Sequence, residues 1–132
     1  MNTTATNNGG WETSNMRSYV GGTIVSLIPS NVHIVPVTKY SAGSVATTDY
    51  VWIPSHRELF SNTSYESTGA VYSNKFTTYD ARKKMSQGSV TAYALRTADT
   101  GGTDSFVMVA VTGGVTTRRA NMWVPFAIGF CT

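Results

Sequence analysis

The spacing of apolar side chains predicts a helix near the beginning of the chain. Between Trp11 and Pro29, apolar positions recur three and four residues apart, as they do along one face of a helix. Gly21 and Gly22 interrupt this pattern, because each glycine costs about 1 kcal/mol in a helix interior. We therefore expect a helix over residues 13–20, followed by a break or a second short turn that ends before Pro29.

The next part of the chain alternates between short apolar runs and polar loops. Residues 32–37 have the composition of a strand, in which Pro36 requires an edge position or a bulge. A loop of small residues is expected over 39–48. The apolar run 50–53 is expected to be buried and to stop at Pro54.

The strongest local signal is the sequence Ser-His-Arg-Glu that begins at Ser55. Ser55 can accept a hydrogen bond from the backbone of Glu58, whose carboxylate can reach back to the amide of Ser55. This capping box predicts a helix of one or two turns over residues 55–61. The following stretch, 62–87, is irregular and rich in aromatic residues, with a short helix predicted over 79–85. A segment of this length has to be anchored by its side chains.

The last third of the chain is predicted to be β structure. Strand-like runs cover residues 90–98, 106–111 and 122–130, and glycine pairs at 101–102 and 113–114 mark turns between them. Helical segments followed by a three-stranded antiparallel meander predict an α+β fold rather than a parallel α/β sheet.

Composition sets the class of protein. A chain of 132 residues has room for one domain, which we place at 11–132 after a polar lead-in at 1–10. Hydrophobic residues make up 41%, enough for a core, whereas charged residues make up only 13%, about half the usual share. Cys131 is the single cysteine, so no internal disulfide is possible. The apolar runs are too short for a membrane span, and the beginning does not resemble a signal peptide.

The net charge of +3 is spread along the chain. The densest basic clusters are Arg82-Lys83-Lys84 and Arg118-Arg119, which we interpret as solvated surface charges. A nucleic-acid binder is expected to show a basic stripe with interleaved aromatic residues, and none is visible. Nucleic acid is therefore not an expected partner.

The sequence offers little for catalysis or metal binding. His33 falls inside a predicted strand, and His56 is expected to face solvent in the first turn of a helix. Neither has the partners that a catalytic base requires, so we expect no enzyme activity. Calcium generally takes six to eight oxygen ligands, so calcium binding through Asp99 and Asp104 is open but not favoured. No metal and no cofactor are expected.

Several short segments match, in order, the pattern of a known group of domains. The pattern Gly-Gly-Trp-x-x-Ser-x-Met-Arg occupies 9–17, and Trp-Ile-Pro-Ser-x-Arg-Glu-Leu-Phe occupies 52–60. Shorter matches lie at 27–30, 35–39, 94–97 and 129–131. Together they resemble small domains in tail and other structural proteins of phages from Gram-positive hosts.

That family is similar to the C-type-lectin-like fold of formylglycine-generating enzymes and of the variable proteins of diversity-generating retroelements. The resemblance implies two short helices packed on a small twisted antiparallel sheet with long loops. It also implies display on the tail or capsid of a virion, after synthesis in the host cytoplasm. It carries no enzyme activity, because the paired cysteines of those enzymes are absent. The chain departs from the pattern at 92–94, which lack a Trp-Trp pair, and at Ile128, which replaces a proline.

The resemblance also places the ligand-facing surface in the C-terminal region. Short polar side chains on glycine-rich loops suit recognition, and arginines suit a carboxylate or a phosphate. Tyr93 could stack on a sugar ring or lie in the core. The candidate ligand-binding residues are Tyr93, Arg96, Thr97, Asp99, Thr100, Asp104, Ser105, Thr116, Arg118, Arg119 and Asn121. The three tryptophans, Trp11, Trp52 and Trp123, are expected in the core, because a tryptophan buries a large area.

These features favour a non-enzymatic binding domain that recognises a host cell-surface glycan or protein through its C-terminal sheet and loops. The alternative is a structural or decoration protein whose loops contact other virion proteins. A homo-oligomer such as a trimer is typical of phage fibres, although no seam for one is visible in the sequence. Membrane insertion is not expected.

Overall fold

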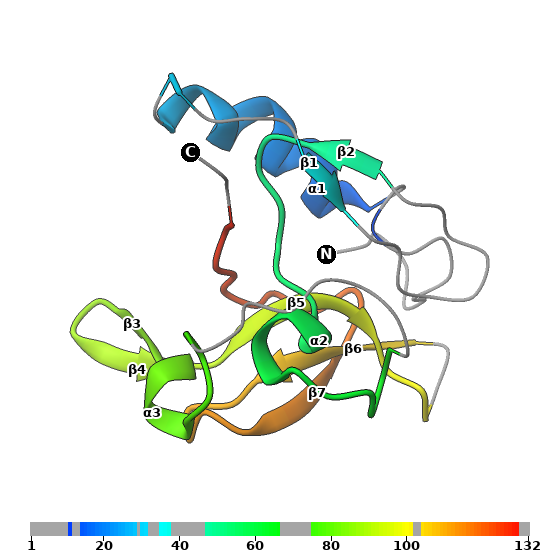
Figure 1. The fold of residues 1–132 in the computed structure, drawn as a ribbon, viewed down its shortest axis with the longest axis vertical. Coiled ribbons are helices and arrows are strands. Elements are labelled where there is room, and N and C mark those ends of the chain that lie inside the picture. Colours follow the sequence, from blue (N-terminus) through cyan, green and yellow to red (C-terminus); the bar gives the residue numbers. More distant parts are fainter. Residues whose placement is uncertain are drawn as a thin grey trace.

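The computed structural model describes the backbone of residues 35–37 and the full residues 11, 14–28, 30–31, 47–66, 75–101 and 104–129. Short helices and small antiparallel sheets make up this part of the chain, which confirms the α+β class (Figure 1). None of the helices within it is long and apolar enough to cross a membrane.

Helix α1 (Asn15–Tyr19) lies within the predicted range. The side chain of Ser14 accepts a hydrogen bond from the backbone N of Arg17 at 3.0 Å and so caps the helix. The chain then widens into a π-helical turn, η1 (Val20–Ile24), and tightens into a 3₁₀ turn, η2 (Val25–Leu27). The break predicted at the two glycines thus takes the form of a widened turn.

Strands β1 (Val35–Val37) and β2 (Thr47–Asp49) form an antiparallel ribbon in which Pro36 lies opposite Thr48. This confirms the strand predicted around Pro36 for residues 35–37. His33 and most of the predicted loop at 39–48 lie outside the described residues.

Helix α2 (His56–Phe60) begins with the predicted capping box. The backbone N of Glu58 donates to Ser55 Oγ at 3.2 Å, and the backbone N of Ser55 donates to Glu58 Oε2 at 2.8 Å. The helix ends at Ser61, whose φ of 57° is left-handed. Local sequence alone therefore determines the beginning of this helix.

Helix α3 (Tyr79–Arg82) is shorter than predicted. Lys83 is already extended, and strands β3 (Lys84–Ser86) and β4 (Ser89–Thr91) follow as a hairpin. The hairpin turns at 87–88, where both residues have positive φ, as a two-residue hairpin turn requires. The sequence did not predict this hairpin.

The main sheet is an antiparallel meander of β5 (Tyr93–Ala98), β6 (Ser105–Val109) and β7 (Val115–Arg119), in that order. The meander was predicted, but its third strand was placed wrongly at 122–130. The sequence of β7, Val-Thr-Thr-Arg-Arg, has no apolar alternation because all five residues are exposed at the sheet edge. It therefore lacked the signal of a buried strand.

A tight turn before β7 explains why the third strand begins early. The backbone N of Ala110 donates to the carbonyl of Gly114 at 2.8 Å, and Gly113 has a φ of 86°. A Cβ at Gly113 would lie 2.0 Å from the backbone oxygen of Tyr79, so no other residue fits here without a shift of α3 or of the turn.

Apolar side chains gather in two clusters. The buried members of the first core cluster are Trp11, Val20, Val51, Trp52 and Ile53. The second core cluster lies on the main sheet and contains Leu59, Tyr93, Leu95, Val107 and Val109. Tyr65 and Phe76 pack against the second cluster, which confirms that side chains anchor the irregular stretch 62–87 where it is described.

The C-terminal segment 125–129 joins the two clusters. The backbones of Trp52 and Gly129 exchange hydrogen bonds of 3.0 and 2.8 Å, and the backbone N of Ala94 donates to the carbonyl of Pro125 at 2.8 Å. Phe126 packs against the first cluster and residue 127 against the second. The apolar residues that suggested a strand at 122–130 thus pack against the two clusters instead of forming a strand.

Candidate functional site

Three of the candidate ligand-binding residues lie in the interior, so their assignment to a binding surface was wrong. Tyr93, Arg96 and Thr97 are each 2% exposed or less. They lie on β5, whose first five residues are all buried between α2 and the rest of the sheet. They were assigned to a surface because the resemblance placed the ligand-facing region near the C-terminus, and for Tyr93 the alternative of a core position is the one that holds.

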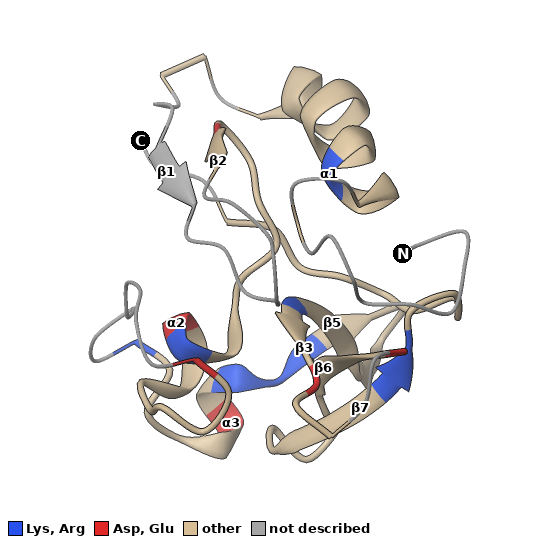
Figure 2. Ribbon diagram, turned by 90° about the vertical axis from the view of Figure 1, so that its right-hand side faces the viewer, with Lys and Arg blue, Asp and Glu red and all other residues tan. Residues whose placement is uncertain are grey.

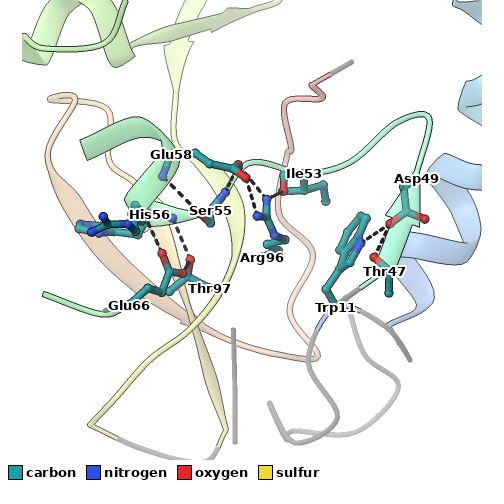
Figure 3. A network of polar contacts seen from close by, with 11 residues as sticks. Trp11, Thr47, Asp49, Ile53, Ser55, His56, Glu58, Glu66, Arg96 and Thr97 are labelled. Atoms are coloured by element: carbon teal, nitrogen blue, oxygen red, sulfur yellow. Dashed lines mark hydrogen bonds and ion pairs between the residues drawn. The ribbon is translucent and has the colours of Figure 1, made fainter. Parts of the chain in front are cut away.

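Arg96 forms a buried ion pair with Glu58 of α2 (Figure 3). Its guanidinium donates to both carboxylate oxygens, at 2.8 and 2.5 Å, and to the carbonyl of Ile53 at 2.7 Å. The same carboxylate accepts the capping hydrogen bond from Ser55. A two-pronged contact of this kind holds α2 against β5 in one orientation.

Thr97 connects α2 to a second buried carboxylate. Its hydroxyl accepts a hydrogen bond from the backbone N of His56 at 2.8 Å and donates to Glu66. Glu66 also accepts from the backbone N of Arg57 at 2.8 Å. Burial raises the pKa of the Glu66 carboxyl, and these hydrogen bonds oppose that rise.

His56 is buried, although the sequence predicted a solvent-facing side chain. Its ring stacks on Phe60, with 4.4 Å between ring centroids, and lies 4.7 Å from the ring of Tyr65. Burial, together with the charge of Arg82, lowers the pKa of His56 from 6.5 to about 4. Nδ1 has no hydrogen-bond partner among the described residues. His56 is therefore neutral at pH 7 and acts as a core aromatic ring.

Arg82 is also buried, which corrects its interpretation as a solvated charge. It donates to the carbonyls of Gly113 and Phe76, at 2.8 and 2.7 Å, and its guanidinium lies over the ring of Phe60. Its own carbonyl accepts from the hydroxyl of Tyr93 at 2.7 Å. Tyr93 is 1% exposed, so this tyrosine is a core residue rather than a sugar platform, and its burial raises its pKa to about 12.

The other candidate residues lie at or near the surface. Asp99, Asp104 and Ser105 are half-buried, and the exposed ones are Thr100, Thr116, Arg118, Arg119 and Asn121. The sheet register places Ser105 opposite Arg119, and the Asp104 carboxylate lies 3.5 Å from the guanidinium of Arg119. Thr116 lies nearer the opposite end of β7. The sheet therefore gathers only part of the predicted set.

A groove of about 440 Å³ lies between α1 and the segment that follows β7. Three of its lining residues, Asn15, Met16 and Tyr19, come from α1. The others are Asn121, Met122, Trp123, Val124 and Phe126. Asn121 is the one predicted ligand-binding residue that lines it.

Three of the residues that line this groove are aromatic: Tyr19, Trp123 and Phe126. The side chain of Trp123 is fully exposed, and Tyr19 is 47% exposed. Tyr19 also meets Phe126 edge to face, with 6.2 Å between ring centroids. None of the described residues that line it is Asp, Glu, Lys, Arg or His. The site can therefore offer flat apolar faces and two neutral amides, but no charge.

The exposed position of Trp123 corrects its prediction as a core residue, whereas Trp11 and Trp52 are buried as predicted. A turn in which the backbone N of Met122 donates to the carbonyl of Arg119 at 3.1 Å carries Trp123 away from the sheet. A fully exposed tryptophan offers a large flat apolar face to solvent, and in a groove such a face suits a ligand.

Comparison with known proteins identifies a family whose function is unknown. A family model described as a domain of unknown function (DUF6273) matches residues 1–127. The chain belongs to this family. No curated protein and no solved structure matches.

In this DUF6273 domain, sequence reasoning missed the groove because its two sides are about a hundred residues apart. Met16 and Tyr19 belong to the helical spacing between Trp11 and Pro29, and Trp123 belongs to the strand predicted at 122–130. Among the described residues, no group of three His, Cys, Asp or Glu side chains could hold a metal ion.

Proposed function

We propose that this domain binds a sugar unit of a bacterial surface glycan in the groove between α1 and residues 121–126, without catalysing a reaction. The observation that carries the proposal is the fully exposed Trp123, which lines a groove with Tyr19 and, among the described residues, no charged side chain.

The chemistry of the groove suits a neutral sugar ring. A sugar presents C–H groups on its faces and hydroxyls around its rim. The rings of Trp123 and Tyr19 offer flat surfaces for the C–H faces, and the amides of Asn15 and Asn121 can both donate to and accept from hydroxyls. The volume of about 440 Å³ falls in the usual range for small-molecule sites.

The resemblance to phage structural domains supports the biological setting in this proposal. In that setting the domain has a C-type-lectin-like fold, is displayed on a virion and binds a glycan of the host. The α+β class is compatible with such a fold. An experimental structure of the full chain, compared with C-type-lectin-like domains, tests this part of the proposal.

The binding experiment uses the purified chain, labelled with a fluorophore, with intact Gram-positive bacteria and their isolated wall polysaccharides, in the presence and absence of EDTA. We expect saturable binding that EDTA leaves unchanged. Trp123→Ala should weaken it about tenfold, the equivalent of about 1.4 kcal/mol, because the variant loses the stacking surface. Asn121→Ala should weaken it several-fold through the loss of a hydrogen bond worth about 1 kcal/mol.

Tyr50→Ala is the matched control, since Tyr50 is 48% exposed but does not line the groove. Equal binding by the Trp123 and Tyr50 variants would contradict the groove as the site. The absence of binding to every glycan, together with defective particles when the domain is deleted, would favour the structural role in the virion instead.

A further inference from the structure

We infer that the glycan is an anionic polymer, and that Arg118 and Arg119 bind its acidic groups beside the neutral groove. This inference rests on the proposed function and narrows the class of ligand. The acidic group is a phosphate or a carboxylate, since both fit a guanidinium in the same two-pronged geometry.

Arg118 and Arg119 differ from the arginines that the fold itself uses. Arg96 is held by Glu58, Arg82 by two backbone carbonyls, and Arg17 by Asp49 at 2.9 Å. Arg118 and Arg119, in contrast, are exposed on β7, where Figure 2 shows basic residues on the strand. Their charges are therefore available to a ligand.

The contacts of these two arginines within the protein are weak. Within the described part of the chain, Arg118 has no ion-pair partner. Arg119 approaches Asp104 at 3.5 Å, with the two side chains 70% and 40% exposed. An exposed pair at this distance contributes little, so an incoming anion can compete for the guanidinium.

Arg119, the nearer of the two arginines, lies close to the groove, and Arg118 precedes it on β7. Two peptide units separate Arg119 from Asn121, so their Cα atoms lie at most about 7.6 Å apart. The hydrogen bond from Met122 to the carbonyl of Arg119 holds this turn together. A polymer with one sugar against Trp123 can therefore extend along β7 and place an acidic group on a guanidinium.

The test uses wall polysaccharides in three forms: native, treated with hydrofluoric acid to remove phosphodiesters, and carbodiimide-coupled to a neutral amine to mask carboxylates. We expect wild type to bind the native form about tenfold more tightly than one of the treated forms, as charge-assisted hydrogen bonds would give. Which treatment weakens binding identifies the acidic group. The double variant Arg118→Gln/Arg119→Gln should bind native and treated forms equally, and lose most of the dependence on salt concentration.

The matched control is Lys75→Gln/Lys84→Gln, which removes the same charge from two exposed lysines outside the groove and β7. Equal affinity of wild type for all three forms would overturn the inference, as would a preference that survives in the arginine variant or is lost equally in the lysine control. The proposed function fails separately, through the absence of glycan binding or of any effect of Trp123→Ala.

Discussion

The buried network between α2 and β5 and the exposed groove beside α1 both unite residues from distant parts of the chain. In the network, Glu58, Glu66, Arg96 and Thr97 are almost completely buried, and their polar groups contact one another or the backbone. In the groove, Trp123 and Tyr19 are exposed, although their rings are large and apolar. In these two regions, charged and polar side chains are buried and large aromatic side chains are exposed, which is the reverse of the usual arrangement.

The residues of the buried network stabilise the fold, whereas the exposed residues of the groove are available to a ligand. The segments at 9–17, 52–60 and 94–97, singled out in the sequence, contribute mostly to the fold where they are described. Trp52 pairs with Gly129, Glu58 with Arg96, and Trp11 with Asp49 through its indole N–H at 2.9 Å. These residues therefore hold the architecture together, whereas Trp123 and Asn121 lie outside these segments and line the groove.

The largest effect is expected from breaking the buried ion pair. Arg96→Met leaves the carboxylate of Glu58 buried without its partner, which should lower the free energy of unfolding by about 3–5 kcal/mol. Urea denaturation measures this change. The double variant Glu58→Gln/Arg96→Met should lose less than the sum of the single variants, because it leaves no buried charge unpaired.

Arg119→Met is the matched control for that experiment, since it removes an exposed arginine that lies 3.5 Å from Asp104. We expect a cost below about 1 kcal/mol. A similar loss of unfolding free energy in both variants would mean that the buried ion pair contributes no more to stability than an exposed one.

The next effect is a dependence of stability on pH that arises from His56. Its pKa is about 4 in the folded protein and 6.5 in the unfolded chain, so between these values the unfolded chain binds more protons. Stability from this group is complete above pH 6.5 and is lost as the pH falls toward 4. The loss amounts to at most about 3 kcal/mol, at 1.36 kcal/mol per pKa unit.

The variant His56→Phe keeps a ring on Phe60 but cannot titrate. Urea denaturation between pH 4 and 7.5 should show wild type losing stability relative to this variant as the pH falls. Glu66 acts in the opposite direction, because its raised pKa makes the folded state bind protons more readily, and it is present in both proteins. Parallel curves for the two proteins would show that His56 is not protonated on unfolding in this range.

A smaller effect is expected where the C-terminal segment meets the first core cluster. A Cβ on Gly129 would lie 3.0 Å from the indole of Trp52, which is buried and cannot readily move. Gly129→Ala should therefore cost about 1–3 kcal/mol, as other overpacked sites do.

Gly21→Ala is the control, because a Cβ there meets nothing within 4 Å and the backbone is helical. It should leave stability unchanged or raise it by up to about 1 kcal/mol. Thermal unfolding compares the two, and an equal loss in both would indicate that the Trp52 contact is unimportant.

The smallest effect on stability is expected at the most exposed aromatic residue. Trp123→Ala should change the free energy of unfolding by no more than about 0.5 kcal/mol, since the side chain buries little area. Trp52→Ala, in contrast, should cost about 3–5 kcal/mol. A large loss on replacing Trp123 would show that it packs in solution, and would remove the main support for a binding groove.

Sequence reasoning succeeded where neighbouring residues decide the structure. The capping box at Ser55, the helix break at Gly21-Gly22 and the turn at Gly113-Gly114 depend on a few adjacent residues, and all three are present. It failed at β7 and at the hairpin after α3, where exposed or irregular residues leave no apolar periodicity. It also failed for Arg96 and His56, because their burial depends on partners elsewhere in the chain.

The amino-acid sequence by itself determined the α+β class and the beginning of α2, because apolar spacing and capping act over a few residues. Only the tertiary structure decided which polar residues are interior and which tryptophan is exposed. The burial of a side chain depends on which other parts of the chain pack against it. Glu58 meets Arg96 only after the chain has folded, and the same holds for α1 and Trp123 on the two sides of the groove.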